Sequence, residues 1–179
     1  MTLGLSENHF ALFGFPVDFT VAQDQLVQRY RELQQTVHPD RFASASDQER
    51  RLAMQRATQI NEGYQTLKDP LARARYLLEL SGVRWDDEQE TMADPAFLME
   101  QMERRETLAE AREQNDPLAT VGGLLDELGA DVRAMTGELT ESFAAADLDR
   151  AKTLVRRLQF LYKLRSEAEA LEADLEDEL

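Results

Sequence analysis

Cysteine is absent from the 179-residue chain, and histidine occurs only twice, as His9 and His38. Without cysteine the protein can form no disulfide, no thiolate metal site and no cysteine nucleophile. The chain also lacks any apolar run near the roughly eighteen residues that a membrane span requires, and its start lacks a basic segment followed by an apolar one. We therefore expect a cytoplasmic protein that makes no membrane contact.

Strand signals are equally scarce. The chain has five prolines and eight glycines, and no stretch alternates β-branched residues with polar ones. Because a half-buried strand needs such alternation, the sequence predicts an all-α protein. Its length is sufficient to bury the core of one large domain or two small ones.

The motifs of common enzyme sites are also missing. The sequence contains no His-Glu-x-x-His, no Gly-x-x-x-x-Gly-Lys and no Gly-x-Gly-x-x-Gly. The C-terminal half has no histidine, which excludes the Glu-x-x-His pairs of a di-iron bundle. Asp40 lies near His38, as a base and its orienting group would, but no nucleophile or metal site accompanies them. We predict that the chain is no enzyme and binds no metal, nucleotide or other cofactor.

Charge divides the chain into two parts. Residues 1–76 carry nine Lys/Arg and nine Asp/Glu, whereas residues 77–179 carry eleven and twenty-six, so that the whole net charge of −15 lies in the second part. A strongly acidic surface repels phosphate backbones and anionic lipids. Nucleic acid and membranes are therefore poor candidate partners, and basic protein surfaces are better ones.

The most informative stretch is His38-Pro39-Asp40, which lies between two helical patterns. The patterns consist of apolar residues at steps of three and four, which lie on one face of a helix. Before the tripeptide these residues are Leu26, Val27, Tyr30, Leu33 and Val37; after it they are Leu52, Ala53, Ile60, Tyr64 and Leu67, joined by Arg56. Since Pro39 pushes His38 out of helical geometry, the first helix is expected to end just before the tripeptide. The tripeptide then lies in an exposed loop.

Shorter signals place the remaining elements of the first part. A short helix is predicted at residues 10–13, and capping boxes are predicted at residues 20–23 and 46–49, at the starts of the two long helices. Asp69-Pro70 ends the second long helix and opens another, which continues to Leu80. Together these elements form a predicted domain of residues 1–80.

Residues 81–94 have the composition of a linker, with Gly82, an acidic run and the only tryptophan. Trp85 is expected to pack between two domains, as large aromatic residues at such places usually do. A three-helix bundle is predicted for residues 95–179. Its first helix spans about residues 95–113, and the other two carry apolar stripes. The stripe residues are Val121, Leu125, Leu128, Val132, Met135, Leu139 and Phe143, and then Leu154, Leu158, Leu161, Arg165 and Ala168.

The helix of residues 95–113 has apolar residues on two sides. At 100° per residue, one face carries Phe97, Gln101, Arg104, Leu108 and Ala111, and the opposite face carries Leu98, Met99, Met102, Glu103, Glu106 and Glu110. The second face could be an exposed apolar patch rimmed by carboxylates, as in a protein-binding surface, or both faces could be buried. Phe160 lies off the apolar line of its own helix and would join the patch.

These features together resemble a known family. A short helix, a long helix, His-Pro-Asp and a second long helix resemble the J domain of J-protein co-chaperones. Further segments, at residues 12–16, 38–44, 60–67, 69–78 and 97–102, resemble the HscB family of iron–sulfur assembly co-chaperones. These segments are spread along much of the chain.

The resemblance implies a docking site for a DnaK/HscA-type chaperone. The residues carried over for it are His38, Pro39, Asp40 and Arg41, with Arg29 and Arg31 on the preceding helix. Asp40 would offer a carboxylate to an arginine of the chaperone, and Pro39 would limit the entropy that the loop loses on binding. J domains usually have more basic residues on that helix, so electrostatic attraction is expected to contribute less here. The alternative is that the tripeptide only stops a helix, which explains Pro39 and Asp40 but leaves the histidine without a role.

The resemblance also implies a second partner, the iron–sulfur scaffold protein IscU. The carried-over residues are Leu98, Met99, Met102, Glu103, Glu106, Glu110 and Phe160. The implied function is that of a co-chaperone that stimulates the chaperone's ATPase and delivers the scaffold to it, with the cluster held by the scaffold. Two alternatives stay open: a J-protein for another client, and an acidic helical adaptor without chaperone stimulation.

Overall fold

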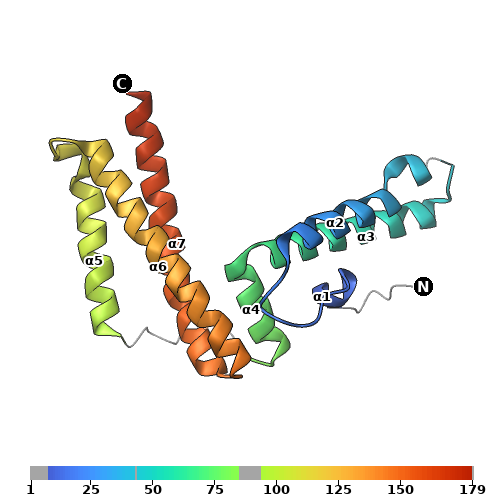
Figure 1. The fold of residues 1–179 in the computed structure, drawn as a ribbon. Helices are drawn as coiled ribbons and strands as arrows, with labels where there is room; N and C mark the ends of the chain where they lie inside the picture. Colours follow the sequence, from blue (N-terminus) through green and yellow to red (C-terminus); the bar gives the residue numbers. More distant parts are fainter. Residues whose placement is uncertain (1–7, 43, 85–93, 179) are drawn as a thin grey trace. The chain divides into compact units, whose positions relative to one another are not determined.

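The computed structural model describes residues 8–42, 44–84 and 94–178, and every regular element in these ranges is a helix (Figure 1). The predicted all-α fold class is therefore confirmed. The chain separates into two compact units, Met1–Gly82 and Val83–Leu179, each with its own packing. No helix of the described ranges has the length and apolar character needed to cross a membrane. Trp85 and the acidic run that follows it lie outside the described residues.

The N-terminal unit is a helical hairpin with short flanking helices. It contains α1 (His9–Leu12), α2 (Gln23–Thr36), a 3-10 turn η1 (Pro39–Phe42), α3 (Asp47–Lys68) and α4 (Pro70–Leu80). The long helices α2 and α3 lie side by side, and η1 joins them at one end of the hairpin (Figure 1). The core lies where α1 and α4 pack against the hairpin of α2 and α3. Its fully buried side chains include Phe10, Leu26, Leu67 and Leu78.

The close approach of α1 to α3 requires a glycine at position 63. A Cβ atom there would lie 2.9 Å from Cε2 of Phe13 and 3.1 Å from Nδ1 of His9. Real Cβ atoms do not approach a ring carbon at that distance, and the Phe13 ring is buried, so it has little room to move. Gly63 therefore allows the short helix to pack against the middle of α3.

Of the three helix starts predicted from capping signals in this unit, two are confirmed. Ser46 forms a capping box with Glu49, whose carboxylate accepts from the Ser46 backbone N–H at 2.8 Å. Asp69 caps α4, and Pro70 occupies the first turn. The capping box at residues 20–23 is wrong, because α2 begins after Ala22 without any side-chain cap. The backbone N–H of Thr20 instead donates to Oδ1 of Asp18 at 2.7 Å, so Asp18 organises the preceding turn.

The C-terminal unit is the predicted three-helix bundle. It contains α5 (Pro95–Glu110) with a 3-10 extension η2 (Ala111–Glu113), α6 (Pro117–Ala144) and α7 (Leu148–Asp177). The long helices α6 and α7 form an antiparallel pair, and α5 packs beside them (Figure 1). Asp94 and Asp116 each cap a helix whose first residue is proline, a combination that starts a helix sharply.

The stripes predicted for α6 and α7 form the centre of this bundle. Val121, Leu128, Leu139, Leu158 and Leu161 are fully buried. The stripe of α6 departs from the predicted line, because Leu124 is buried whereas Leu125, Met135 and Phe143 are only partly so. In the N-terminal unit one residue of the predicted apolar stripe is exposed. Leu52 keeps 40% of its surface exposed, since the first turns of α3 extend beyond the core.

Two candidate protein-binding surfaces

The His38-Pro39-Asp40 tripeptide lies on the surface, at the start of η1. Helix α2 ends at Thr36, and the buried side chain of Val37 anchors the chain directly before the tripeptide. From Pro39 onward the backbone turns as a 3-10 helix, in which the N–H of Arg41 donates to the carbonyl of His38 at 3.0 Å. The predicted exposed loop is therefore a short, hydrogen-bonded turn.

Contacts inside the turn leave the Asp40 carboxylate open to solvent. The backbone N–H of Asp40 donates to Nδ1 of His38 at 3.3 Å, an arrangement that requires that nitrogen to be unprotonated. The nearest Asp40 carboxylate oxygen lies 3.6 Å from the same nitrogen, and the Asp40 side chain is 91% exposed. Arg41 reaches back across the turn, where its Nη1 donates to the carbonyl of Gln35 at 3.3 Å. The imidazole thus supports the backbone of the turn while the carboxylate faces outward.

The two predicted basic residues of α2 differ in their availability. Arg31 is exposed. Arg29 is only partly exposed, because its Nη1 donates to the carbonyl of Phe13 at 2.5 Å and its guanidinium lies 4.2 Å from the centre of the Phe15 ring. Arg29 therefore fastens the loop after α1 to α2, and these contacts would compete with any contact to a partner. The positive charge nearest to the tripeptide is that of Arg41.

A polar cluster that sequence reasoning missed joins α2 to α3. Oδ1 of Asn61 accepts from the Tyr30 hydroxyl at 2.9 Å and from Nε2 of Gln34 at 2.6 Å. The rings of Tyr30 and Tyr64 stack at 4.1 Å between centres. Only the helical spacing of Tyr30 and Tyr64 in their stripes signalled this contact. The cluster fixes the spacing of the two helices that support the turn.

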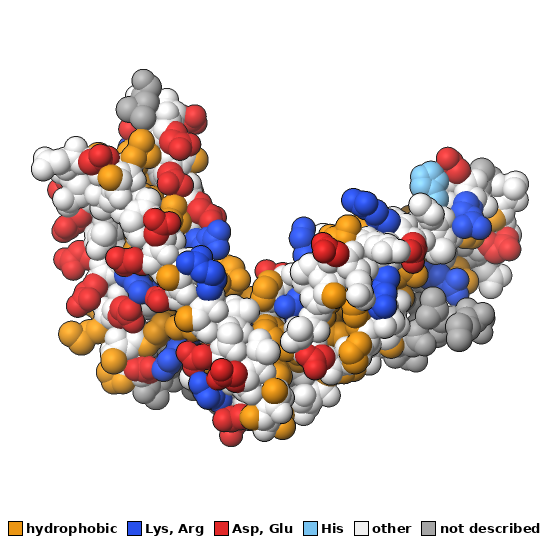
Figure 2. All heavy atoms as spheres, in the orientation of Figure 1, with side chains coloured by type: hydrophobic (Ala, Val, Ile, Leu, Met, Phe, Trp, Pro, Cys, Tyr) orange, Lys and Arg blue, Asp and Glu red, His pale blue; other side chains and the backbone are white. Residues whose placement is uncertain are grey.

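On α5 the structure separates the two predicted faces. Phe97, Gln101 and Ala111 are buried, whereas the opposite face is exposed. Exposed on that face are Leu98 (36%), Met99 (65%) and Met102 (70%), with the carboxylates of Glu103, Glu106 and Glu110. Figure 2 shows hydrophobic side chains on the outer surface near one end of this unit and acidic ones beside them. An apolar patch rimmed by carboxylates has the composition of a protein-binding surface.

Phe160 of α7, the residue predicted to join this patch, is 40% exposed and contacts α5. Its ring meets that of Phe97 edge to face, with 6.3 Å between centres and 80° between planes. The guanidinium of Arg157 lies 5.4 Å from the centre of the Phe97 ring and forms an ion pair with Asp94. Phe97 thus joins α5 to α7 through its contacts with Phe160 and Arg157. The exposed part of Phe160 adds apolar surface on α7. We refer to Leu98, Met99, Met102, Glu103, Glu106, Glu110 and Phe160 as the α5 face.

Ion pairs hold α5 against the rest of the bundle. The Arg104 side chain is only 12% exposed, and its Nη2 lies 2.9 Å from Glu100 and 2.6 Å from Asp131 of α6. At the other end, Arg112 of η2 pairs with Glu178, the residue after α7, at 2.7 Å, which raises the pKa of the arginine. The buried amide of Gln101 has no hydrogen-bond partner among the described residues. The inner face of α5 is therefore more polar than those of α6 and α7, and ion pairs lie beside its apolar contacts.

In the described ranges, no group of three or more His, Asp or Glu side chains is placed to hold a metal ion.

Comparison with known proteins yields consistent matches. Residues 93–169 match a family model described as the HSCB C-terminal oligomerisation domain. A co-chaperone protein HscB homolog of Pseudoalteromonas atlantica is 46% identical over 173 residues, which cover 95% of this chain and 99% of that protein. A second homolog, from Shewanella amazonensis, is 44% identical over the same shares.

Solved structures agree with these sequence matches. The chaperone HscB from Vibrio cholerae superposes with a TM-score of 0.87 at 41% identity, covering 94% of this chain and 99% of that one. Human co-chaperone protein HscB superposes with a TM-score of 0.88 at 28% identity, covering 95% of this chain and 84% of that one.

Proposed function

The chain belongs to the HscB co-chaperone family, whose members are not enzymes, and we propose that it links an HscA-type chaperone to the iron–sulfur scaffold protein IscU. In this proposal residues 1–80 form a J domain that stimulates the chaperone's ATPase. Residues 81–94 form a linker, and residues 95–179 form a bundle that captures the scaffold. Both partners and the protein itself would be in the cytoplasm.

The observation that carries the chaperone part of the proposal is the outward-facing carboxylate of Asp40. A charge-assisted pair between this carboxylate and an arginine of the chaperone would form without rearranging the turn, because the Asp40 backbone is already bound to His38. The prefolded turn would lower the entropy cost of docking. Arg31 and Arg41 would add attraction to an acidic surface of the chaperone.

The scaffold part of the proposal is supported by the exposure of the α5 face. Its two methionines adapt to the shape of a partner, and Phe160 offers an aromatic anchor at its edge. Glu103, Glu106 and Glu110 would complement basic residues of the scaffold and orient it. Because this chain has no cysteine, the cluster would be held by the scaffold.

The test is single-turnover ATP hydrolysis by an HscA-type chaperone, with purified IscU and with either the wild-type chain or Asp40→Asn. The substitution keeps the shape of the side chain and removes its charge. We expect stimulation by the wild type to increase synergistically with IscU, and to fall at least about a hundredfold in the variant, the order of effect for the loss of a central charged contact. Binding of IscU to the variant, and its circular dichroism, should be unchanged.

The alternatives predict different results. Stimulation that needs Asp40 but is indifferent to IscU would indicate another client. No stimulation by a wild-type protein with full helicity would overturn the chaperone part and favour an acidic adaptor.

A further inference from the structure

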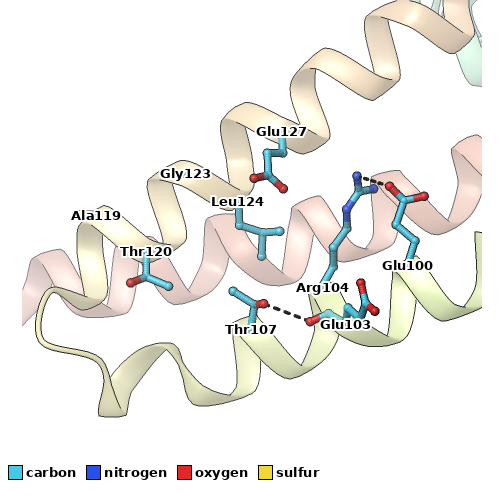
Figure 3. A pocket seen from close by; sticks show the side chains of 9 residues that line it. All are labelled: Glu100, Glu103, Arg104, Thr107, Ala119, Thr120, Gly123, Leu124 and Glu127. Carbon is cyan, nitrogen blue, oxygen red and sulfur yellow. Dashed lines mark hydrogen bonds and ion pairs between the residues drawn. The ribbon is translucent and has the colours of Figure 1, made fainter.

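A groove runs between α5 and α6 beside the α5 face, with a volume of about 470 Å³ (Figure 3). The α5 wall includes Glu100, Glu103 and Arg104, and the α6 wall includes Gly123, Leu124 and Glu127. Glu103 also belongs to the α5 face, so the groove and that face form one continuous surface.

The groove carries excess negative charge. The charge of Arg104 is compensated twice, by Glu100 and by Asp131. Glu103 and Glu127 lie on opposite walls, and neither carboxylate has a hydrogen bond or ion pair in the described ranges. Figure 3 shows the Glu127 side chain projecting from α6 into the space that faces α5. A cation entering between the walls would meet two carboxylates with no internal partner.

The floor of the groove suits the stem of a long side chain. Leu124 lines the groove, and the small part of it that is exposed is apolar. At Gly123 a Cβ atom would meet nothing within 4 Å, so the missing side chain leaves that part of the groove open. Lysine and arginine have this combination of an aliphatic stem and a charged end, and they place the stem on apolar surface while the charge stays at polar groups.

We propose that this groove binds a lysine or arginine side chain of the client protein that docks on the α5 face. This inference rests on the proposed function, in which the α5 face captures a client. The groove would give the same client a second contact that depends on charge. The apolar residues of the face would supply contact area, and the groove would select a client with a basic residue at the matching position.

The first test fills the groove without changing its charge. Gly123→Gln places a long neutral side chain in the open space, and Gly137→Gln is the matched control, since Gly137 is exposed on the same helix and a Cβ there also meets nothing within 4 Å. Glutamine favours a helix more than glycine, so both variants should fold. Titration of IscU by calorimetry should give an affinity about tenfold weaker for Gly123→Gln, the effect expected for one charged contact, and an unchanged affinity for the control.

The second test reverses one charge at either of two neighbouring positions, in variants that have the same net charge as each other. Glu127→Lys places a cation in the groove, whereas Asp126→Lys makes the same change one position away, outside the lining residues. Only Glu127→Lys should weaken IscU binding about tenfold or more, and the loss should shrink at high salt. If both variants lose IscU affinity equally, the effect is a general electrostatic attraction, and the inference that the groove binds a basic side chain is wrong.

The remaining outcomes separate the groove from the α5 face. If Leu98→Ala/Met99→Ala/Phe160→Ala abolishes binding while both groove variants bind like the wild type, the groove inference fails and the proposed function stands. If the wild type does not bind IscU at all, both fail. If sedimentation velocity shows that Gly123→Gln alters self-association while client affinity is unchanged, the occupant is a second copy of this chain and the inference is wrong.

Discussion

The two units of the chain present their candidate binding residues by different physical means. In the N-terminal unit the central residues, His38-Pro39-Asp40, lie at a 3-10 turn, where a proline and hydrogen bonds between close neighbours set the geometry. In the C-terminal unit they lie on one face of a helix and on a second helix, and packing between helices brings them together. The first surface is a local feature of the backbone, and the second exists only when the bundle has formed.

The units also differ in how their outer elements are attached. Helix α1 packs on α3 through aromatic rings that fit against Gly63. Helix α5 and its extension η2 pack through Phe97 and Ala111, with ion pairs of Arg104 and Arg112 beside them. An element held by charge pairs responds to salt and to a charged partner more than one held by ring packing.

The largest effect in this comparison of the two units is expected when the apolar side chains of the α5 face are removed. In Leu98→Ala/Met99→Ala/Phe160→Ala all three side chains are partly exposed, so the bundle should keep its fold. We expect IscU affinity to fall by about a hundredfold or more, because three anchors of the apolar contact are lost. ATPase stimulation without IscU should be unchanged. Calorimetry and single-turnover hydrolysis would check this, and unchanged IscU affinity would remove the α5 face from the proposal.

A smaller effect is expected when one glycine in each unit is replaced by alanine and the free energies of unfolding are compared. Gly63→Ala should lower the free energy of unfolding of the N-terminal unit by about 1–2 kcal/mol, because the new Cβ overlaps the Phe13 ring. Gly137→Ala should raise that of the bundle by about 0.5–1 kcal/mol, since the added methyl meets open space and alanine favours the helix. Thermal unfolding followed by circular dichroism would measure both. Stabilisation by both substitutions would show that α1 does not depend on the glycine.

The smallest expected effect is the change in stability of the N-terminal unit with pH. Burial against Tyr76 lowers the pKa of His9 below its ordinary value of 6.5, and nearby Glu62 only partly offsets this. The unfolded chain therefore takes up a proton at His9 first, so the N-terminal unit should lose stability as the pH falls below about 6.5. The transition that Gly63→Ala lowers should follow this trend between pH 7.5 and 5.5. His9→Gln should flatten it, whereas His38→Gln, at an exposed position, should leave it in place; the opposite pattern would contradict the assignment.

Particular residues show where sequence reasoning succeeded. The 100° spacing placed Met99 and Met102 on the side of α5 opposite Phe97 and placed Phe160 off its stripe, but it left open whether that side of α5 is exposed. The capping residues Ser46 and Asp69 were recognised because their hydrogen bonds span only three residues of the chain. Leu52 was misplaced because periodicity identifies a helix face but not how far along the helix the core extends.

Local order along this chain thus determined its all-helical class, most of its helix boundaries and the exposed turn at His38-Pro39-Asp40. These features depend on groups within a few residues of one another, whose geometry is limited by proline, by capping side chains and by helical spacing. Tertiary structure alone decided that Arg29 is held by Phe13 and Phe15, that Asn61 joins α2 to α3, and that a groove opens beside Gly123. Such contacts join residues from different elements, and their distances are set by how the helices pack.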